Sequence, residues 1–145
     1  MKEETTSRLD QILKSVDSHS DAKKFAEDHA VQPKFFYEYV NDYIAEHEIV
    51  VSEMVELSGI STNYIYGILN GRTKSPGRDK IIAICIAAGM TLDELNRGLE
   101  ISGNNPLYPK NERDIHIAAC VNKGERDVTR INIQLDEAGI EPLKV

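Results

Sequence analysis

The sequence has no tryptophan, only two cysteines among 145 residues, and no apolar run near the roughly 20 residues that a membrane span needs. Its first residues lack the hydrophobic stretch of a secretory signal peptide. We therefore expect a cytoplasmic protein without a membrane partner, in which Cys85 and Cys120 are core thiols and not a disulfide. Apolar residues make up 41% of the chain, enough for one compact domain or two small ones.

Positive charge is also scarce. The chain has 17 basic and 24 acidic residues, a net charge of -7, so any affinity for nucleic acid must come from a local patch. The acidity is concentrated at the N-terminal end, because residues 1–48 contain 6 basic and 11 acidic side chains. The remainder of the chain is close to neutral.

The usual signatures of catalysis are missing. The sequence has no glycine-rich phosphate loop, no Gly-x-Ser-x-Gly elbow and no Cys/His pair with a plausible orienting acid. His116 and Cys120 lie four residues apart on one expected helix, but two ligands do not make a zinc site. We therefore predict no catalytic residues, no metal, no cofactor and no enzymatic activity.

Apolar residues recur at helical spacing along the whole chain, which predicts an all-α protein. We expect residues 1–32 to form an acidic helical extension, and a further helix to follow Pro33 to about Glu48. Gly59 ends a short helix at about 51–58, and Ser61 caps another that runs to about 70. Two helices joined by a tight glycine turn are a helix-turn-helix. Two further helices are expected at 79–88 and 92–101.

The last third of the chain contains an internal repeat. Residues 78–89 match residues 113–124 in their Arg-Asp start, their cysteine and their final glycine, and both copies end in a Pro-Leu pair. Chance similarity between two amphipathic hairpins is the alternative, but amphipathicity does not require these landmarks. We predict three parts: the extension 1–32, a helix-turn-helix domain 33–107, and a helical hairpin 108–145 that repeats 78–107.

The run from Ser52 to Arg72, followed by Met90-Thr91-Leu92-Asp93-Glu94-Leu95, resembles the Cro/repressor (XRE) family of helix-turn-helix regulators. The resemblance implies a lambda repressor-like domain of five helices, whose third helix enters the major groove of DNA. It implies that this helix and the loop after it contact DNA. The expected DNA-binding residues are Ser61, Thr62, Asn63, Tyr66, Asn70, Arg72 and Lys74.

Helical geometry agrees with this assignment. At 100° per residue, one arc of the helix contains Ser61, Ile65, Ile68 and Leu69, and the opposite arc contains Thr62, Asn63, Tyr66, Gly67 and Asn70. Asparagine can pair with adenine and threonine can contact a thymine methyl, although both residue types also favour the solvated first turn of a helix. The basic loop residues Arg72, Lys74, Arg78 and Lys80 are either phosphate contacts or solvated side chains.

These observations predict a sequence-specific transcriptional regulator that binds double-stranded DNA, with a homodimer as the expected form. A protein partner for the N-terminal helices is a further expectation. The alternative is a protein-interaction adaptor that has lost DNA binding. The acidic net charge, Val51 in place of a polar residue, and Gly67 on the expected reading arc favour that alternative.

Overall fold

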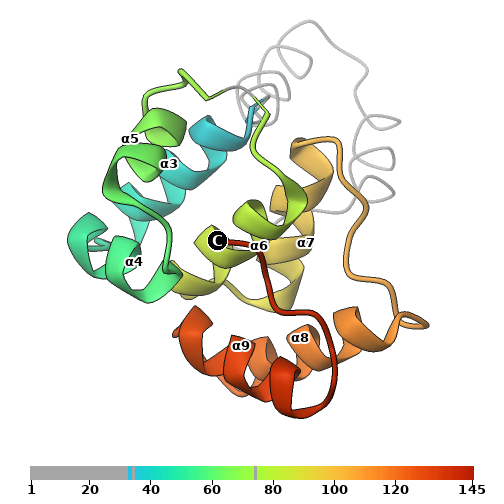
Figure 1. Ribbon diagram of the computed structural model, residues 1–145. Helices are drawn as coiled ribbons and strands as arrows, with labels where there is room; N and C mark the ends of the chain where they lie inside the picture. Colours follow the sequence, from blue (N-terminus) through green and yellow to red (C-terminus); the bar gives the residue numbers. More distant parts are fainter. Residues whose placement is uncertain (1–32, 34, 74) are drawn as a thin grey trace, which may run out of the picture. The chain divides into compact units, whose positions relative to one another are not determined.

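The computed structural model describes residues 33, 35–73 and 75–145 (Figure 1). These residues contain seven helices and no strand, which confirms the all-α prediction. The helices predicted within residues 1–32, and the protein partner expected for them, lie outside the described part. None of the described helices has the length and apolar character to span a bilayer.

The helix boundaries agree with the sequence to within a few residues. Pro33 precedes the first described helix by three residues, and Gly59 and Gly71 each follow the end of a helix. The five helices of residues 36–101 are α3 (Phe36–Glu46), α4 (Val51–Ser58), α5 (Thr62–Leu69), α6 (Arg78–Ala87) and α7 (Leu92–Ile101).

Helix α6 lies at the centre of the core (Figure 1). Every residue from Ile81 to Ala87 is buried, so this helix has no solvent-facing stripe. Helices α4, α7 and α9 (Val128–Glu137) all pack against it. A helix that is apolar all round is stable in water only when its neighbours cover it.

Tyrosine hydroxyls attach α3 to the α6–α7 hairpin. Tyr39 donates to the backbone oxygen of Glu94 at 2.8 Å, and Tyr43 donates to that of Gly89 at 3.3 Å. Burial and the nearby Glu94 carboxylate raise the pKa of Tyr43 to about 12, so its hydroxyl stays protonated as a donor. Helix α3 thereby provides a fixed support for α5, against which it also packs.

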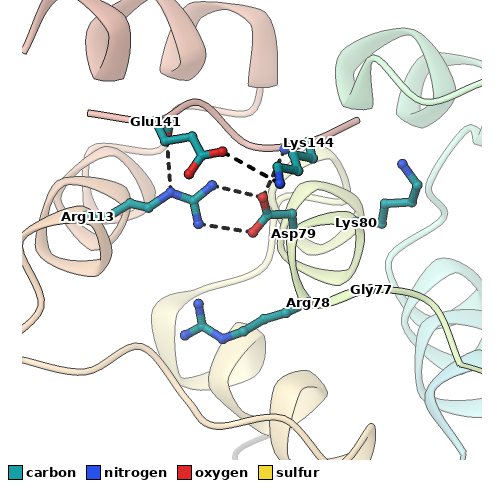
Figure 2. Close-up of a pocket in the computed structure, with 7 residues that line it drawn as sticks. All are labelled: Gly77, Arg78, Asp79, Lys80, Arg113, Glu141 and Lys144. Carbon is teal, nitrogen blue, oxygen red and sulfur yellow. Dashed lines mark hydrogen bonds and ion pairs between the residues drawn. The ribbon is translucent and has the colours of Figure 1, made fainter. Parts of the chain in front are cut away.

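Helix α8 (Glu112–Asn122) and α9 form a second hairpin, and reciprocal ion pairs join it to α6. Arg78 of α6 binds the carboxylate of Asp114 in α8, with a shortest distance of 3.0 Å. Arg113 of α8 binds Asp79 of α6 at 2.8 Å (Figure 2). Each guanidinium uses two nitrogens on one carboxylate, the bidentate geometry that makes such pairs strong and directional.

Each aspartate also accepts a backbone hydrogen bond from the end of a hairpin. Asp79 accepts from the amide of Lys144 at 3.0 Å (Figure 2), and Asp114 accepts from that of Tyr108 at 2.9 Å. Burial raises the pKa of Asp79, but the hydrogen bonds from Arg113 and Lys144 outweigh it and hold the pKa below its usual value. Lys34–Val145 form one compact unit, and the boundary predicted at 107/108 stays a prediction.

Candidate nucleic-acid interface

The turn between α4 and α5 is short, and two serine hydroxyls hold it by hydrogen bonds. The buried hydroxyl of Ser58 donates to the oxygen of Val55 at 2.8 Å and accepts from the amide of Ile60 at 3.0 Å. Gly59 ends α4 in the left-handed conformation, with φ at 72°, where a side chain would be strained. Ser61 then caps α5 by accepting from the amide of Tyr64. This turn fixes the angle at which α5 leaves α4.

Helix α5 has a buried arc and an exposed arc, largely as its sequence predicts. Ile65 and Ile68 are buried, whereas Thr62, Asn63 and Tyr66 are exposed. Ser61 differs from the prediction, because its capping position outside the helix leaves it exposed and not on the buried arc. The first turn of α5 has no acidic side chain to repel phosphate. The exposed arc is therefore open to a partner at its N-terminal end.

Gly67 does not belong to the exposed arc, which corrects the prediction from helical spacing. It is buried because the chain after α5 folds back over it, and the amide of Thr73 donates to the oxygen of Gly67 at 2.9 Å. A methyl group at position 67 would lie 2.9 Å from the Thr73 hydroxyl oxygen. Glycine at position 67 therefore leaves room for the loop after α5, and its missing side chain is not evidence that a DNA contact has been lost.

The end of α5 is held by contacts that the sequence patterns did not predict. Asn41 of α3 donates to the oxygen of Leu69 at 2.7 Å, and the ring of Tyr37 lies against Gly71. The side-chain oxygen of Asn70 accepts from both the amide and the Nε of Arg72, each at 3.1 Å. Asn70 thus orients Arg72, which is exposed. Periodicity reports which side of a helix is buried and contains no signal for such contacts between elements.

The predicted basic cluster of the loop is not a single surface. Arg78 is bound to Asp114, and Lys80 lies over the ring of Tyr64, 5.1 Å from its centroid. Both cations therefore have a partner within the fold, and their role as phosphate contacts stays a prediction. Tyr64 packs against the core, as predicted. Lys74 lies outside the described residues.

The segment 35–73, which contains α5, is mainly acidic. Arg72 is the one basic residue in residues 35–73, which contain six carboxylates: Glu38, Asp42, Glu46, Glu48, Glu53 and Glu56. Phosphate contacts by lysine and arginine supply most of the non-specific affinity of proteins for DNA. This composition therefore predicts weak non-specific binding and leaves a larger share of any affinity to hydrogen bonds with bases.

Comparison with known families assigns this region. Residues 40–104, from within α3 to just beyond α7, match the family of Cro/C1-type helix-turn-helix DNA-binding domains. The chain contains a Cro/C1-type domain. The range matched by this Cro/C1-type family includes α4 and α5, the two helices that the tight glycine turn joins. Searches of curated proteins and of solved structures found no match.

Proposed function

We propose that this protein is a sequence-specific DNA-binding transcriptional regulator that reads the major groove with α5. The observation that supports this most directly is the exposed arc of Thr62, Asn63 and Tyr66 on the second helix of a Cro/C1-type helix-turn-helix. The protein acts as a regulator and not as an enzyme. It works in the cytoplasm, with double-stranded DNA as its partner and without a cofactor.

The residues of the proposed interface have different roles. Asn63 and Thr62 lie at the N-terminal end of α5, where an amide can form two hydrogen bonds with adenine and a threonine methyl can contact thymine. Ser61 and Tyr66 flank them and contact the backbone or groove wall. Arg72, held by Asn70, contacts phosphate, and Lys74 has the same role in the loop.

The proposed domain roles follow from this division. Residues 33–107 bind DNA, and residues 108–145 brace the central helix α6 through the two Arg–Asp pairs. One short helix and one ordered arginine give a single half-site little affinity. We therefore propose a homodimer that binds two half-sites of a two-fold operator.

Selection of bound duplexes from a random DNA pool, at low salt, tests the proposal and identifies the site. Asn63→Ala should weaken binding to the selected site by about 1–3 kcal/mol and change binding to random DNA much less. Asn105→Ala, at an exposed asparagine in the α7–α8 loop, is the matched control and should leave both affinities unchanged. If no duplex is enriched, the protein does not read DNA in this way.

Salt dependence separates phosphate contacts from base contacts. Arg72→Gln should weaken binding to all duplexes about equally and lower the slope of log affinity against log salt by about 0.9. Arg130→Gln, at an exposed arginine on α9, should leave the slope unchanged. A change of sequence preference with the same slope would contradict the phosphate role.

A protein-interaction adaptor is the second candidate function, and the single arginine among six carboxylates in residues 35–73 favours it. On that reading the exposed arc of α5 binds another protein. Failure to enrich any duplex, combined with a partner whose binding is lost on Tyr66→Ala, would support the adaptor. Enrichment of a defined sequence that requires Asn63 would exclude it.

A further inference from the structure

The two hairpins α6–α7 and α8–α9 have the same local hydrogen bonds at equivalent positions. Gly89 and Gly124 both end their first helix with φ at 81°. Asn96 accepts from the amide of Leu107 at 2.9 Å, and Asn132 accepts from that of Leu143 at 2.8 Å. The repeat predicted from the sequence therefore has a counterpart in the contacts within each hairpin.

The contacts between the hairpins are reciprocal. Arg78 of the first hairpin binds Asp114 of the second, while Arg113 of the second binds Asp79 of the first. In a two-fold symmetric contact, the arginine of each copy binds the aspartate of the other copy, as it does here. The pair behaves as an internal dimer, in which α6 is equivalent to α8 and α7 to α9.

Helix α4 breaks this symmetry. It packs against α6 and α9, whereas no described helix occupies the equivalent position on α8 and α7. That position is instead an apolar groove of about 430 Å³. It is lined chiefly by Leu92, Leu107, Tyr108, Ile115, Ala118 and Ala119.

Burial shows the consequence for α8. In α6, Ile84 and Ala87 are buried, whereas the matching Ala119 and Asn122 of α8 are exposed. Ala118, which matches the buried Ala83, is half-buried. Ile115 of α8 is 48% exposed. The groove on α8 and α7 is therefore equivalent to the surface of α6 and α9 that α4 covers in the same molecule.

We propose that a second copy of this chain occupies the groove, with α8 of each protomer packed against the α7–α8 groove of the other. Residues 115, 118, 119 and 122 of α8 are Ile, Ala, Ala and Asn, an uncharged face. Their spacing equals that of residues 51, 54, 55 and 58 in α4, which include its buried Met54 and Ser58. Helix α8 thus lines the groove and also presents an uncharged face with the same spacing as these residues of α4, the helix at the equivalent position.

Two further features favour a second copy over an unrelated helix. An isologous dimer needs one self-complementary patch, and the uncharged face of α8 that would enter the groove is also part of the groove's lining. The groove also adjoins the internal hairpin interface, because Asp114 lines the groove and binds Arg78 of the other hairpin. The inference rests on the homodimer of the proposed function and specifies its surface, but it does not depend on DNA binding.

Sedimentation equilibrium of the full chain, without DNA, tests the proposal. The wild type should dimerise, and Ala119→Arg should weaken dimerisation at least tenfold by placing a charge in the groove. Ala138→Arg, at an exposed alanine after α9, is the matched control and should leave the dimer unchanged. An unchanged melting curve at a concentration where both proteins are monomers confirms that the Ala119 variant is folded.

A wild type that stays monomeric at the highest soluble concentration would overturn the proposal, as would a dimer that Ala119→Arg does not weaken. A wild type that stays monomeric and binds a helix of another protein in this groove would likewise overturn it. Binding to a DNA half-site separates the two proposals, because Ala119→Arg should not alter it. Loss of dimerisation in a protein that binds no DNA would support this surface and contradict the regulator.

Discussion

The α6–α7 and α8–α9 hairpins have similar sequences and lie in different surroundings. Both begin with an Arg-Asp pair, turn at a glycine and return to an asparagine that holds the end of the hairpin. The first is enclosed by α3, α4 and the second hairpin, whereas the second leaves one face of α8 exposed. Local sequence therefore sets the shape of each hairpin, and the neighbouring helices decide which of its faces become core.

The largest expected difference between the hairpins is at residues 84 and 119. Ile84→Ala should lower the free energy of unfolding by about 2–5 kcal/mol, because Ile84 is 1% exposed and its truncation leaves a cavity in the core. Ala119→Ser, at the equivalent exposed place in α8, should change it by less than about 0.5 kcal/mol. Urea unfolding at low protein concentration measures both, and equal effects would contradict the difference in burial.

The two ion pairs should respond alike, because their geometry is reciprocal. Asp79→Asn and Asp114→Asn should each destabilise the protein by about 1–3 kcal/mol, since each removes a bidentate partner from a partly buried arginine. Urea unfolding of the two variants tests the internal symmetry. A large effect at one aspartate and none at the other would show that a single pair joins the hairpins.

Acid should weaken the Asp79 pair. The pKa of Asp79 lies below its usual value in the folded protein, so its contribution is complete above the unfolded pKa of about 4. The contribution is lost as the pH falls through the folded pKa. The difference in unfolding free energy between wild type and Asp79→Asn should therefore be constant near neutrality and shrink below about pH 4. A constant difference down to pH 2 would contradict this.

The asparagines that close the two hairpins should differ slightly. Asn132 makes two hydrogen bonds to the backbone of Leu143, at 2.8 and 3.1 Å, whereas Asn96 accepts one from Leu107 at 2.9 Å. At about 1 kcal/mol per hydrogen bond, Asn132→Ala should cost more than Asn96→Ala. Thermal melts of the two variants decide the order, and a greater loss for Asn96→Ala would be the contrary result.

The smallest expected difference between the hairpins is in the reactivity of their cysteines, and it can be measured on the wild-type protein. Cys85 and Cys120 are both buried, and burial raises the pKa of each thiol, so both should react slowly with a thiol reagent in the native protein. Cys120 should react first, because it lies on the less covered hairpin and is 6% exposed against 0% for Cys85. Labelling followed by mass spectrometry of peptides gives the order, and denaturant should abolish the difference.

The sequence was sufficient for much of the fold. Helical spacing, caps and glycines predicted the seven described helices and the tight turn before α5, because these features depend on residues close together in the chain. The same spacing placed Ile65 and Ile68 in the core and Thr62, Asn63 and Tyr66 outside it. The resemblance to the Cro/repressor family rests on two short runs of sequence, Ser52 to Arg72 and Met90 to Leu95, and the family match at residues 40–104 agrees with it.

Contacts between distant segments were decided only in the tertiary structure. Gly67 is buried because the loop that contains Thr73 folds over it. Arg78 is bound to the carboxylate of Asp114, a residue 36 positions further along the chain that no local pattern connects with it. The groove on α8 exists because α4 covers one hairpin and not the other. Residues close together in the chain determine the helices and turns. Burial and ion pairing depend on which distant segments pack against one another, and only the tertiary structure decides that.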